Sequence, residues 1–315
     1  MAPKTQRNCA GFVAILIALL ILAIGIVVVA LALRGTAREA EAPGTAPPAT
    51  IRVGSYNLAI LGDTKLGRPM VMTTISAILA GFDLAALQEV GSNASKASDE
   101  SCRQALEELI DGMNKAVGGE SFSYLQGDQF AFVYRKDRLR AGEERLYDGE
   151  RKFTYRPLVA RFSVPGTSFD FVAMTVHTSP DLAKNEVPAL ADAMDEIVRA
   201  FGEPDLICLG DFNADGSYYD EGAEPGLEGF PDSRFITVIP DDADTTVGEK
   251  ELAYDRIELT RAMMTDYAGS WGVIRPGEVY DLSGAEGPAQ WAGTDRALSD
   301  HFPVWADFVT GADAD

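Results

Sequence analysis

Cysteine is scarce in this chain, and its scarcity excludes two classes of protein. The 315 residues contain three cysteines, too few for a disulfide framework. No Cys-x-x-Cys pair occurs, which argues against a zinc–thiolate site. Cys208 lies in the apolar run DLICL and is expected to be a small core residue. A hydrophobic core must therefore hold the fold.

Basic residues are also few. The chain has 27 Lys and Arg against 48 Asp and Glu, a formal net charge of −21, and the acidic excess lies after residue 50. The mean field of such a domain repels polyanions, so a phosphate substrate needs a local basic or metal-lined cleft. This weakens a nucleic-acid function without excluding one. With 46% hydrophobic residues, the chain can bury the core of one large domain or two small ones.

Charges are absent from one long segment near the start. Residues 11–33 are 23 uncharged residues, GFVAILIALLILAIGIVVVALAL, long enough to span a bilayer. A signal-peptide core has about 7–15 residues, so a membrane anchor is preferred, and ALA at 30–32 leaves a cleaved, secreted form open. Lys4 and Arg7 precede the segment and favour the N-terminus inside and the large acidic part outside.

The predicted anchor divides the chain into parts. Short apolar strands and amphipathic helices mix after it without strict alternation, which is typical of α+β folds. One helix is expected over residues 186–201, with Pro188 in its first turn. The parts are a short cytoplasmic N-terminus (1–10), the transmembrane helix (11–33), a flexible Ala- and Pro-rich linker (34–50), one domain (51–309) and a tail (310–315).

Polar side chains stand at the ends of several apolar strands, where neighbouring strands can bring them to one rim. The chain has two histidines, and both occur in these segments, which favours a shared site over isolated core or surface histidines. Simpler alternatives stay open, such as an Asx turn for Asp211 and Asn213 or a surface ion pair for Asp255. The residues are Asn57, Glu89, His177, Asp211, Asn213, Asp255, Asp300 and His301.

In their order along the chain, these segments resemble the endonuclease/exonuclease/phosphatase superfamily, and most closely the deoxyribonuclease I family. The resemblance covers residues 51–309. GDFN and SDH are shared across the superfamily, whereas NADGSY, DADTT and AYDRI are more specific to deoxyribonuclease I. The matching segments are YNLAILGDTK, LQEV, FVYR, GDFNADGSY, IPDDADTT, AYDRI and SDHFPV.

The resemblance implies a four-layered α/β-sandwich, with two packed mixed sheets flanked by helices, that hydrolyses phosphodiesters with a divalent metal. Oxygen-ligated Mg²⁺ offsets the charge of the phosphodiester, and histidines titrate near neutrality. By position, Glu89, Asn57 and Asp300 look like ligands of a catalytic Mg²⁺, with Mn²⁺ as an alternative. Asp211 and Asn213 look like the pair that holds the attacking water, the phosphate and a second metal. His301 and Asp255 look like one His–carboxylate pair, and His177 looks like half of a second.

The chain departs from the family pattern at the partner of the first histidine. The family has a glutamate just before the FVYR strand, and alignment on FVYR puts Asp128 there, one methylene shorter. Arg156, in YRPL, lies one residue out of register with a family arginine. Tyr218 occupies the place of a tyrosine beside the substrate backbone. Asp128 is therefore a candidate catalytic residue, and Arg156 and Tyr218 are candidate substrate-binding residues.

Two stabilising features of the family are incomplete. Its structural disulfide falls on Gly216 and Leu252 here, so both halves are missing together. Its calcium site near ADTT keeps Asp244 and Thr246, but the following threonines are replaced by GEK. The loops must be held in another way, and the resemblance leaves a structural Ca²⁺ undecided.

Three functions follow from these observations. The first is a membrane-anchored, extracytoplasmic, Mg²⁺-dependent DNA endonuclease, a monomer that leaves 5′-phosphates. The second keeps the chemistry but acts on a lipid or small phosphoester, as sphingomyelinases do, and the membrane tether and acidity favour it. The third is a non-catalytic binding module with the same fold, and the presence of both histidines and their acidic neighbours opposes it.

Overall fold

The computed structural model describes residues 50–91, 99–149, 152–219, 227, 230–231 and 233–311. The predicted membrane span at 11–33 and most of the linker lie outside these ranges, so both stay predictions. Within the described ranges, every helix is too short or too polar to cross a bilayer.

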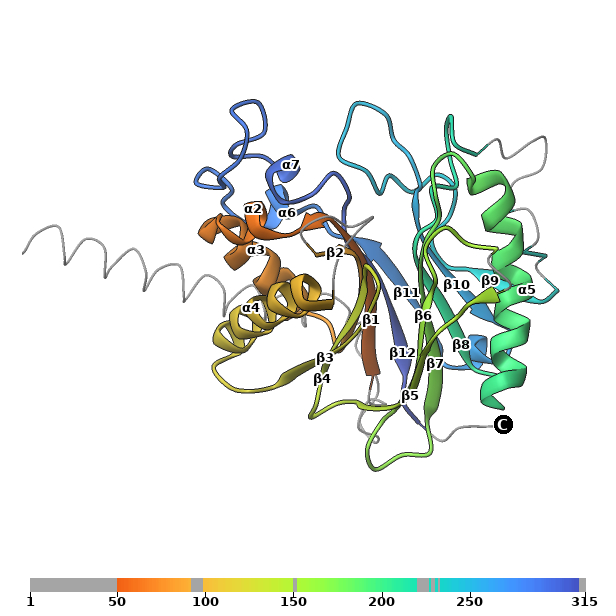
Figure 1. Cartoon of the computed structure of the whole chain (residues 1–315). Coiled ribbons are helices and arrows are strands. Elements are labelled where there is room, and N and C mark those ends of the chain that lie inside the picture. The colour runs from red at the N-terminus through yellow and green to blue at the C-terminus, as the bar shows by residue number, and fades with distance from the viewer. Residues whose placement is uncertain are drawn as a thin grey trace, which may run out of the picture.

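Two six-stranded sheets face each other in the middle of the molecule (Figure 1). Both are mixed, because β1 with β2 and β7 with β8 run parallel while the other neighbours run antiparallel. The first sheet, in spatial order, is β11 (Tyr267–Val273), β12 (Val304–Val309), β1 (Thr50–Leu61), β2 (Leu84–Val90), β4 (Phe130–Arg135) and β3 (Phe122–Gly127). The second is β5 (Arg140–Leu146), β6 (Leu158–Ser163), β7 (Asp170–His177), β8 (Leu206–Asp211), β10 (Asp255–Thr260) and β9 (Phe235–Thr237).

Helices cover the outer face of each sheet and complete four layers (Figure 1). Helices α3 (Pro69–Leu79) and α4 (Asp99–Val117) pack on the first sheet, and α5 (Ala183–Phe201) packs on the second. This confirms the predicted sandwich of two mixed sheets flanked by helices. The short elements are α2 (Asp63–Leu66), η3 (Met263–Thr265), α6 (Pro276–Val279) and α7 (Asp295–Leu298).

Apolar side chains fill the space between the sheets and the space under the helices. The central strand β8 is buried at all six positions, because one of its faces meets the other sheet and the opposite face meets α5. Between the sheets, the rings of Phe132 and Phe162 pack edge to face with centroids 5.5 Å apart. Continuous apolar runs such as DLICL are therefore strands covered on both faces.

Helix α5 begins earlier than the sequence indicated. It starts at Ala183, so Pro188 is its sixth residue, and the prediction that this proline lies in the first turn was wrong. Proline has no amide hydrogen for the helix ladder. The helix tolerates this because its apolar side, including Val187 and Leu190, is buried against the second sheet.

The two parallel strand pairs bring their polar carboxyl ends to one end of the molecule. His177 at the end of β7 is in register with Asp211 at the end of β8, and Asp211 is also in register with Asp255. Gly210 precedes Asp211 with φ 150°, and a Cβ there would lie 2.0 Å from the carbonyl oxygen of Val176. Glycine is therefore required at this point of β8, where β7 leaves no room for a Cβ, just before the polar residues begin.

Candidate active site

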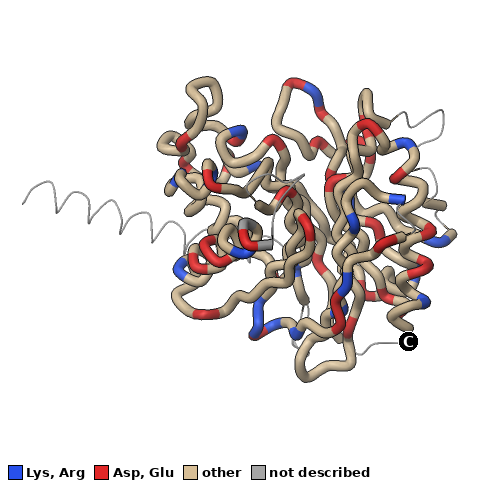
Figure 2. Tube along the Cα trace, in the orientation of Figure 1, with Lys and Arg blue, Asp and Glu red and all other residues tan. Residues whose placement is uncertain are grey.

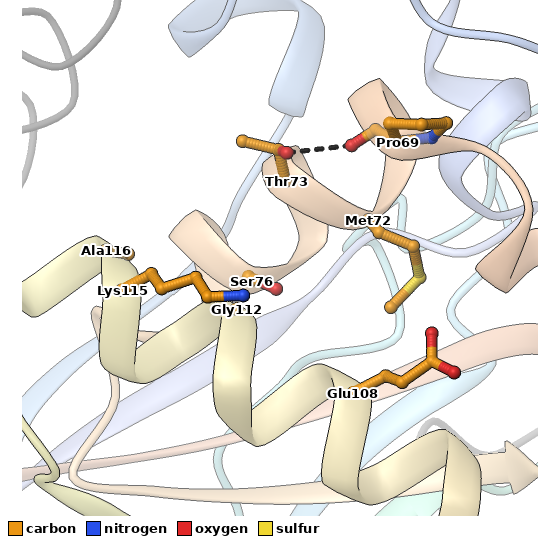
Figure 3. A pocket seen from close by; sticks show the side chains of 8 residues that line it. All are labelled: Pro69, Met72, Thr73, Ser76, Glu108, Gly112, Lys115 and Ala116. Carbon is orange, nitrogen blue, oxygen red and sulfur yellow. Dashed lines mark hydrogen bonds between the residues drawn. The ribbon is translucent and has the colours of Figure 1, made fainter.

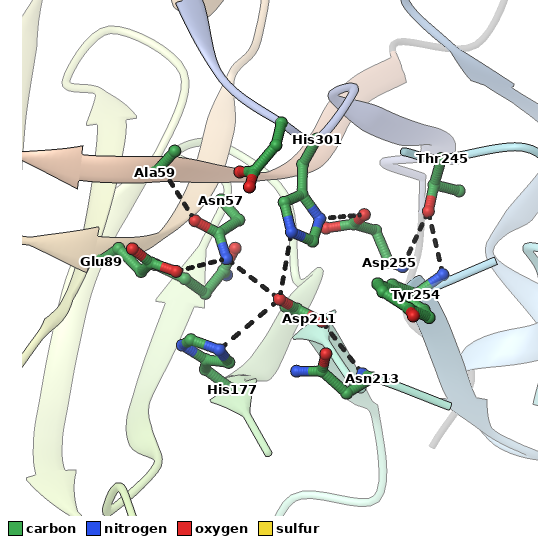
Figure 4. Close-up of polar contacts among 12 residues, drawn as sticks. Asn57, Ala59, Glu89, His177, Asp211, Asn213, Thr245, Tyr254, Asp255 and His301 are labelled. Carbon is green, nitrogen blue, oxygen red and sulfur yellow. Dashed lines mark hydrogen bonds and ion pairs between the residues drawn. The ribbon is translucent and has the colours of Figure 1, made fainter. Parts of the chain in front are cut away.

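The carboxylate of Asp211 is the centre of a polar cluster that contains several of the predicted residues (Figure 4). Its Oδ2 atom lies 3.0 Å from Asn57 Nδ2, 3.5 Å from His177 Nε2 and 3.4 Å from His301 Nε2. Asp211 is 1% exposed, and surrounding donors offset the cost of burying its charge. Asn57 is carried by the first sheet and Asp211 by the second, so the cluster joins both sheets.

His301 and Asp255 form the predicted histidine–carboxylate pair. His301 Nδ1 lies 2.8 Å from Asp255 Oδ2, and Asp255 is fully buried. Burial alone would lower the pKa of His301, but the carboxylates of Asp255 and Asp211 outweigh it and raise the pKa to about 10. Burial raises the pKa of Asp255, and the neighbouring His301 opposes that shift. We conclude that His301 carries a proton at neutral pH and that Asp255 fixes its ring.

His177 has a different partner from the one that the sequence indicated. Nδ1 of His177 lies 3.3 Å from Oε1 of Gln129, a residue that is 1% exposed. The ring of His177 stacks on that of Tyr155, with centroids 5.2 Å apart. Nδ1–H donates to the amide oxygen, so the ring is oriented by a neutral group.

Asp128, the predicted partner of His177, instead binds Arg156. The guanidinium donates from Nε and Nη2 to the two carboxylate oxygens of Asp128, at 3.1 and 3.0 Å. Asp128 and Gln129 form the turn between β3 and β4, and Asp128 has φ 50°. Because consecutive residues of so tight a turn point in different directions, only one of the two faces His177. The expected His177–Asp128 pairing was wrong.

Asn213 is held in the turn after β8. Its backbone amide donates to Asp211 Oδ1 at 3.0 Å, and its Nδ2 donates to the carbonyl of Thr178 at 2.9 Å. The first contact is the Asx turn that the sequence left as a simple alternative. The turn and the polar cluster therefore coexist, since the turn uses Oδ1 of Asp211 and the cluster uses Oδ2.

Glu89, Asn57 and Asp300 are the predicted metal ligands. Asn57 Nδ2 donates to Glu89 Oε1 at 3.1 Å, while Asp300 lies 3.3 Å from Arg296. In the described ranges, no three His, Cys, Asp or Glu side chains come together in a way that could hold a metal ion. The candidate set mixes two carboxylates with an amide. This suits Mg²⁺, which takes one or two carboxylates in proteins and keeps several waters.

Left-handed backbone conformations gather around this cluster. Glu89 has φ 59° and Asn213 has φ 46°. Ala59 and Ile60, at φ 44° and 64°, follow Asn57 in an irregular part of β1. Such conformations are costly for residues with a Cβ and are concentrated at functional sites, where packing enforces them.

Comparison with known proteins agrees with this geometry. A model of the endonuclease/exonuclease/phosphatase family matches residues 54–262. The chain belongs to the endonuclease/exonuclease/phosphatase family.

Within the endonuclease/exonuclease/phosphatase family, this chain is deoxyribonuclease I-like. It is 34% identical to Deoxyribonuclease-1-like 2 of Mus musculus over 82% of this chain and 92% of that one. It is 30% identical to Deoxyribonuclease-1 of Gallus gallus over 81% and 91%. The structure of D. rerio TDP2 complexed with single strand DNA product shares the fold, with TM-score 0.57 at 17% identity over 82% and 99%. The two deoxyribonuclease relatives support phosphodiester hydrolysis, and the TDP2 structure shows the shared fold.

Sequence reasoning missed a buried lysine that supports the site of this family member. Lys65 is 5% exposed, and its ammonium donates to the carbonyls of Leu58, Ala59 and Leu298. Burial lowers the pKa of Lys65 to about 8, although the carboxylates of Asp300 and Glu89 oppose the shift. The lysine thus ties the end of β1 to the segment before Asp300. Its polar context, GDTKL, gives no sign of burial.

The two predicted substrate-binding residues lie at the border of the cluster. Arg156 follows Tyr155, which stacks on His177, and its side chain is 47% exposed. Tyr218 is 38% exposed and packs against Tyr254 with centroids 5.6 Å apart. The Tyr254 ring in turn lies 6.2 Å from that of His301. Each residue is thus linked to a histidine through one tyrosine, and contact with a substrate stays a prediction.

A hollow of about 450 Å³ opens beside His301. It brings two cations and an aromatic ring next to the catalytic candidates, and it is lined by residues 246–250, Leu252, Tyr254, Arg296, Asp300 and His301. Another hollow, of about 370 Å³, lies between α3 and α4 and contains none of the polar cluster (Figure 3). The hollow beside His301 is therefore the one that belongs to the site.

Proposed function

We propose that this protein is a DNA endonuclease that hydrolyses phosphodiester bonds and leaves 5′-phosphates. The observation that carries the proposal is the contact of one buried carboxylate, Asp211, with both histidines and Asn57. The deoxyribonuclease names of the relatives that align over most of this chain support DNA as the substrate.

Glu89, Asn57 and Asp300 supply the oxygen atoms for a divalent ion. When bound, Mg²⁺ or Mn²⁺ supplies positive charge that offsets the charge of the scissile phosphate. Two neutral amides complement it. Asn213 lies 4% exposed beside Asp211, and Nε2 of Gln129 is a buried donor with no acceptor among the described residues. A phosphate oxygen would satisfy such a donor without adding negative charge from the protein.

The proton path uses His301 and Asp211. His301 is protonated at neutral pH and gives its proton to the leaving 3′-oxygen as the bond from phosphorus to that oxygen breaks. Asp211 accepts a proton from the attacking water as the oxygen of that water forms a bond to phosphorus. Because Asp211 Oδ2 lies 3.4 Å from His301 Nε2, the proton returns to His301 and restores both groups.

Nicking of supercoiled plasmid by the full-length chain tests this proposal. With Mg²⁺ or Mn²⁺ we expect nicked circles with 5′-phosphate ends, and no nicking in EDTA. His301→Ala should lose at least about 100-fold in rate, because a general acid contributes that much. His177→Ala should also lose activity, because it removes the contact of Nε2 with Asp211, the proposed base. Asp192→Asn, on the exposed side of α5, is the matched control and should retain full activity.

The other two functions predict different results from the same preparation. If plasmid stays intact with each metal and sphingomyelin or a small phosphodiester is hydrolysed instead, then that phosphoester rather than DNA is the substrate. Tight DNA binding with turnover of none of these substrates would establish a binding module instead.

We also propose that residues 11–33 anchor the protein and that the enzyme is a monomer outside the cytoplasm. The length and apolarity of the segment support the anchor, and the short positive flank before it supports the orientation. Membrane fractionation and protease treatment of intact cells test it. Digestion of the domain from outside is expected, whereas a protected domain would reverse the orientation. Release into the medium would indicate cleavage near residues 30–32. Sedimentation in detergent tests the monomer.

A further inference from the structure

The loop from Asp244 to Tyr254 supports the catalytic candidates directly. Thr245 Oγ1 accepts hydrogen bonds from the backbone amides of Tyr254 and Asp255, both at 3.0 Å (Figure 4). The carbonyl of Thr245 accepts from the amide of Phe302 at 2.7 Å. The amide of Val247 donates to the carbonyl of Asp300 at 2.8 Å. Movement of this loop would therefore displace both members of the His301–Asp255 pair.

An arginine occupies the place where the family resemblance would put calcium. Arg275 Nη2 lies 2.9 Å from Asp244 Oδ2, while Asp244 Oδ1 accepts from the amide of Thr246 at 3.3 Å. The guanidinium also packs over the ring of Phe302, 4.7 Å from its centroid. Ca²⁺ needs six to eight oxygen ligands. Here both oxygens of the key carboxylate are in use and a fixed positive charge stands beside them. These residues do not fit a calcium ion.

Packing and one hydrogen bond occupy the place where the resemblance would put a disulfide. Gly216 has φ 60°, and a Cβ built on it would lie 3.1 Å from Cδ2 of Leu252. The two positions are therefore in contact, as the resemblance requires, but Leu252 fills the space. One residue away, Asp215 Oδ2 accepts from the amide of Ala253 at 2.8 Å. The same two loops are thus joined without a covalent bond.

We infer that Arg275 and Asp215 are positioning residues that hold the loop 244–254 with the chain's own groups, so that the active site needs neither bound calcium nor a disulfide. Arg275 supplies the positive charge and Asp215 supplies the link between the loops. The two positions of the family's disulfide are Gly216 and Leu252 here, so reduction has no bond to break between these loops.

Calcium and reductant tests on the full-length chain address this inference without any variant. With saturating Mg²⁺ to occupy the proposed catalytic site, we expect no calcium binding in equilibrium dialysis, and the same Tm in EGTA, in millimolar Ca²⁺ and in dithiothreitol. Stoichiometric calcium binding with a rise in Tm would overturn the inference, as would a fall in Tm on reduction. These readouts do not depend on the proposed function, so they stand even if plasmid is not cleaved.

Variants test the positioning role. Arg275→Gln and Asp215→Asn should each lower Tm by about 4 °C and lower kcat for plasmid nicking by about tenfold, with KM little changed. Arg275→Lys keeps the charge and should recover part of both losses. Arg261→Gln, which removes an exposed arginine, is the matched control and should change neither quantity. Full activity and unchanged Tm in Arg275→Gln and Asp215→Asn would show that neither residue has a positioning role.

Discussion

At the scale of single residues, the two histidines differ in what holds them. Both rings have Nε2 near Asp211, but Nδ1 of His301 faces the buried carboxylate of Asp255, whereas Nδ1 of His177 faces the neutral amide of Gln129. A carboxylate both orients a ring and stabilises its proton, and an amide only orients it. This asymmetry supports a division of labour in which His301 carries the transferred proton.

The raised pKa of His301 predicts a loss of stability in alkali. The folded state binds this proton more tightly than the unfolded state, whose histidine titrates near 6.5. The contribution of His301 to the free energy of unfolding is therefore complete below about pH 6.5. It is lost as the pH rises to about 10, by at most about 1.4 kcal/mol per pH unit. Thermal unfolding in EDTA from pH 6.5 to 8 should show a falling Tm, whereas above pH 8 the lowered pKa of Lys65 adds stability and opposes the decline.

Asp255→Asn provides the comparison for this pH series. It removes the main carboxylate that raises the pKa of His301, so we expect a lower Tm at pH 7 and a flatter decline. Asp192→Asn, on the exposed side of α5, should follow the unmodified chain. Parallel curves for Asp255→Asn and the unmodified chain would contradict the shift assigned to His301.

Gln129 and Asp128 give a second prediction at this scale, because they are adjacent but face different groups. Gln129→Leu leaves Nδ1 of His177 unpaired in a buried site, and we expect a loss of about 10- to 100-fold in kcat. Gln129→Glu keeps an oxygen acceptor and should retain most of that rate. Asp128→Asn disturbs an exposed ion pair with Arg156 and should cost less than about threefold. If Asp128→Asn lowers kcat more than Gln129→Leu does, then Asp128 rather than Gln129 is the partner of His177. Nicking kinetics at saturating plasmid measure all three.

At the scale of elements, the junction between β8 and its turn decides whether Asp211 can reach both histidines. Gly210 permits β7 and β8 to approach, and the left-handed Asn213 then reverses the chain. The end of β1 has a similar design, where two left-handed residues and the buried ammonium of Lys65 hold the segment after Asn57.

Gly210→Ala is therefore expected to destabilise the domain severely. Its Cβ would lie 2.0 Å from a backbone carbonyl oxygen, so the two strands must separate, at a cost of about 3 kcal/mol or more. Gly166→Ala is the matched control, since Gly166 also has positive φ, 86°, but no neighbour within 4 Å of an added Cβ. It should cost about 1 kcal/mol from backbone conformation alone. Urea unfolding measures both, and equal midpoints would show that the contact at Gly210 is easily relieved.

The sequence predicted the layers of the fold and most of the cluster, because both follow from motifs with fixed positions on strand ends. It could not choose between Asp128 and Gln129, since a one-residue difference within a tight turn reverses which side chain faces inward. It placed the start of α5 too late because the burial of an apolar face outweighed the missing hydrogen bond at Pro188. The burial of Lys65 depends on three carbonyls brought together only by the tertiary fold.

At the scale of the whole molecule, charge opposes the proposed substrate almost everywhere. The chain carries a formal net charge of −21, and acidic residues are spread over the helices and loops on both sides of the sandwich (Figure 2). The hollow beside His301 differs because two cations, Lys250 and Arg296, stand against its two carboxylates, Glu249 and Asp300. Local cations in a repelling field must therefore account for much of the binding of a polyanion.

Reversal of charge at Lys250 tests this distribution. Lys250→Glu should raise KM for plasmid by about tenfold and make the rate less sensitive to added salt, because one phosphate contact is lost. Lys184→Glu makes the same change at an exposed position of α5 and should alter KM less than about twofold. If both variants raise KM equally, net charge rather than the hollow governs binding. Initial rates across plasmid concentrations and two salt concentrations provide the measurement.

The division of the cluster between two sheets has a consequence for how the protein can evolve. Asn57 and Glu89 belong to one sheet and Asp211 to the other, and a buried hydrogen bond from Gln88 to Thr175, 2.9 Å long, crosses between them. The aromatic rings between the sheets therefore help to set the distance between the two sheets, and with it the distance between the two parts of the cluster. A methylene gained or lost in this interior moves Asn57 and Glu89 relative to Asp211. Mutations that alter the activity, or that restore it in a damaged enzyme, should therefore arise in the interior as well as at the site.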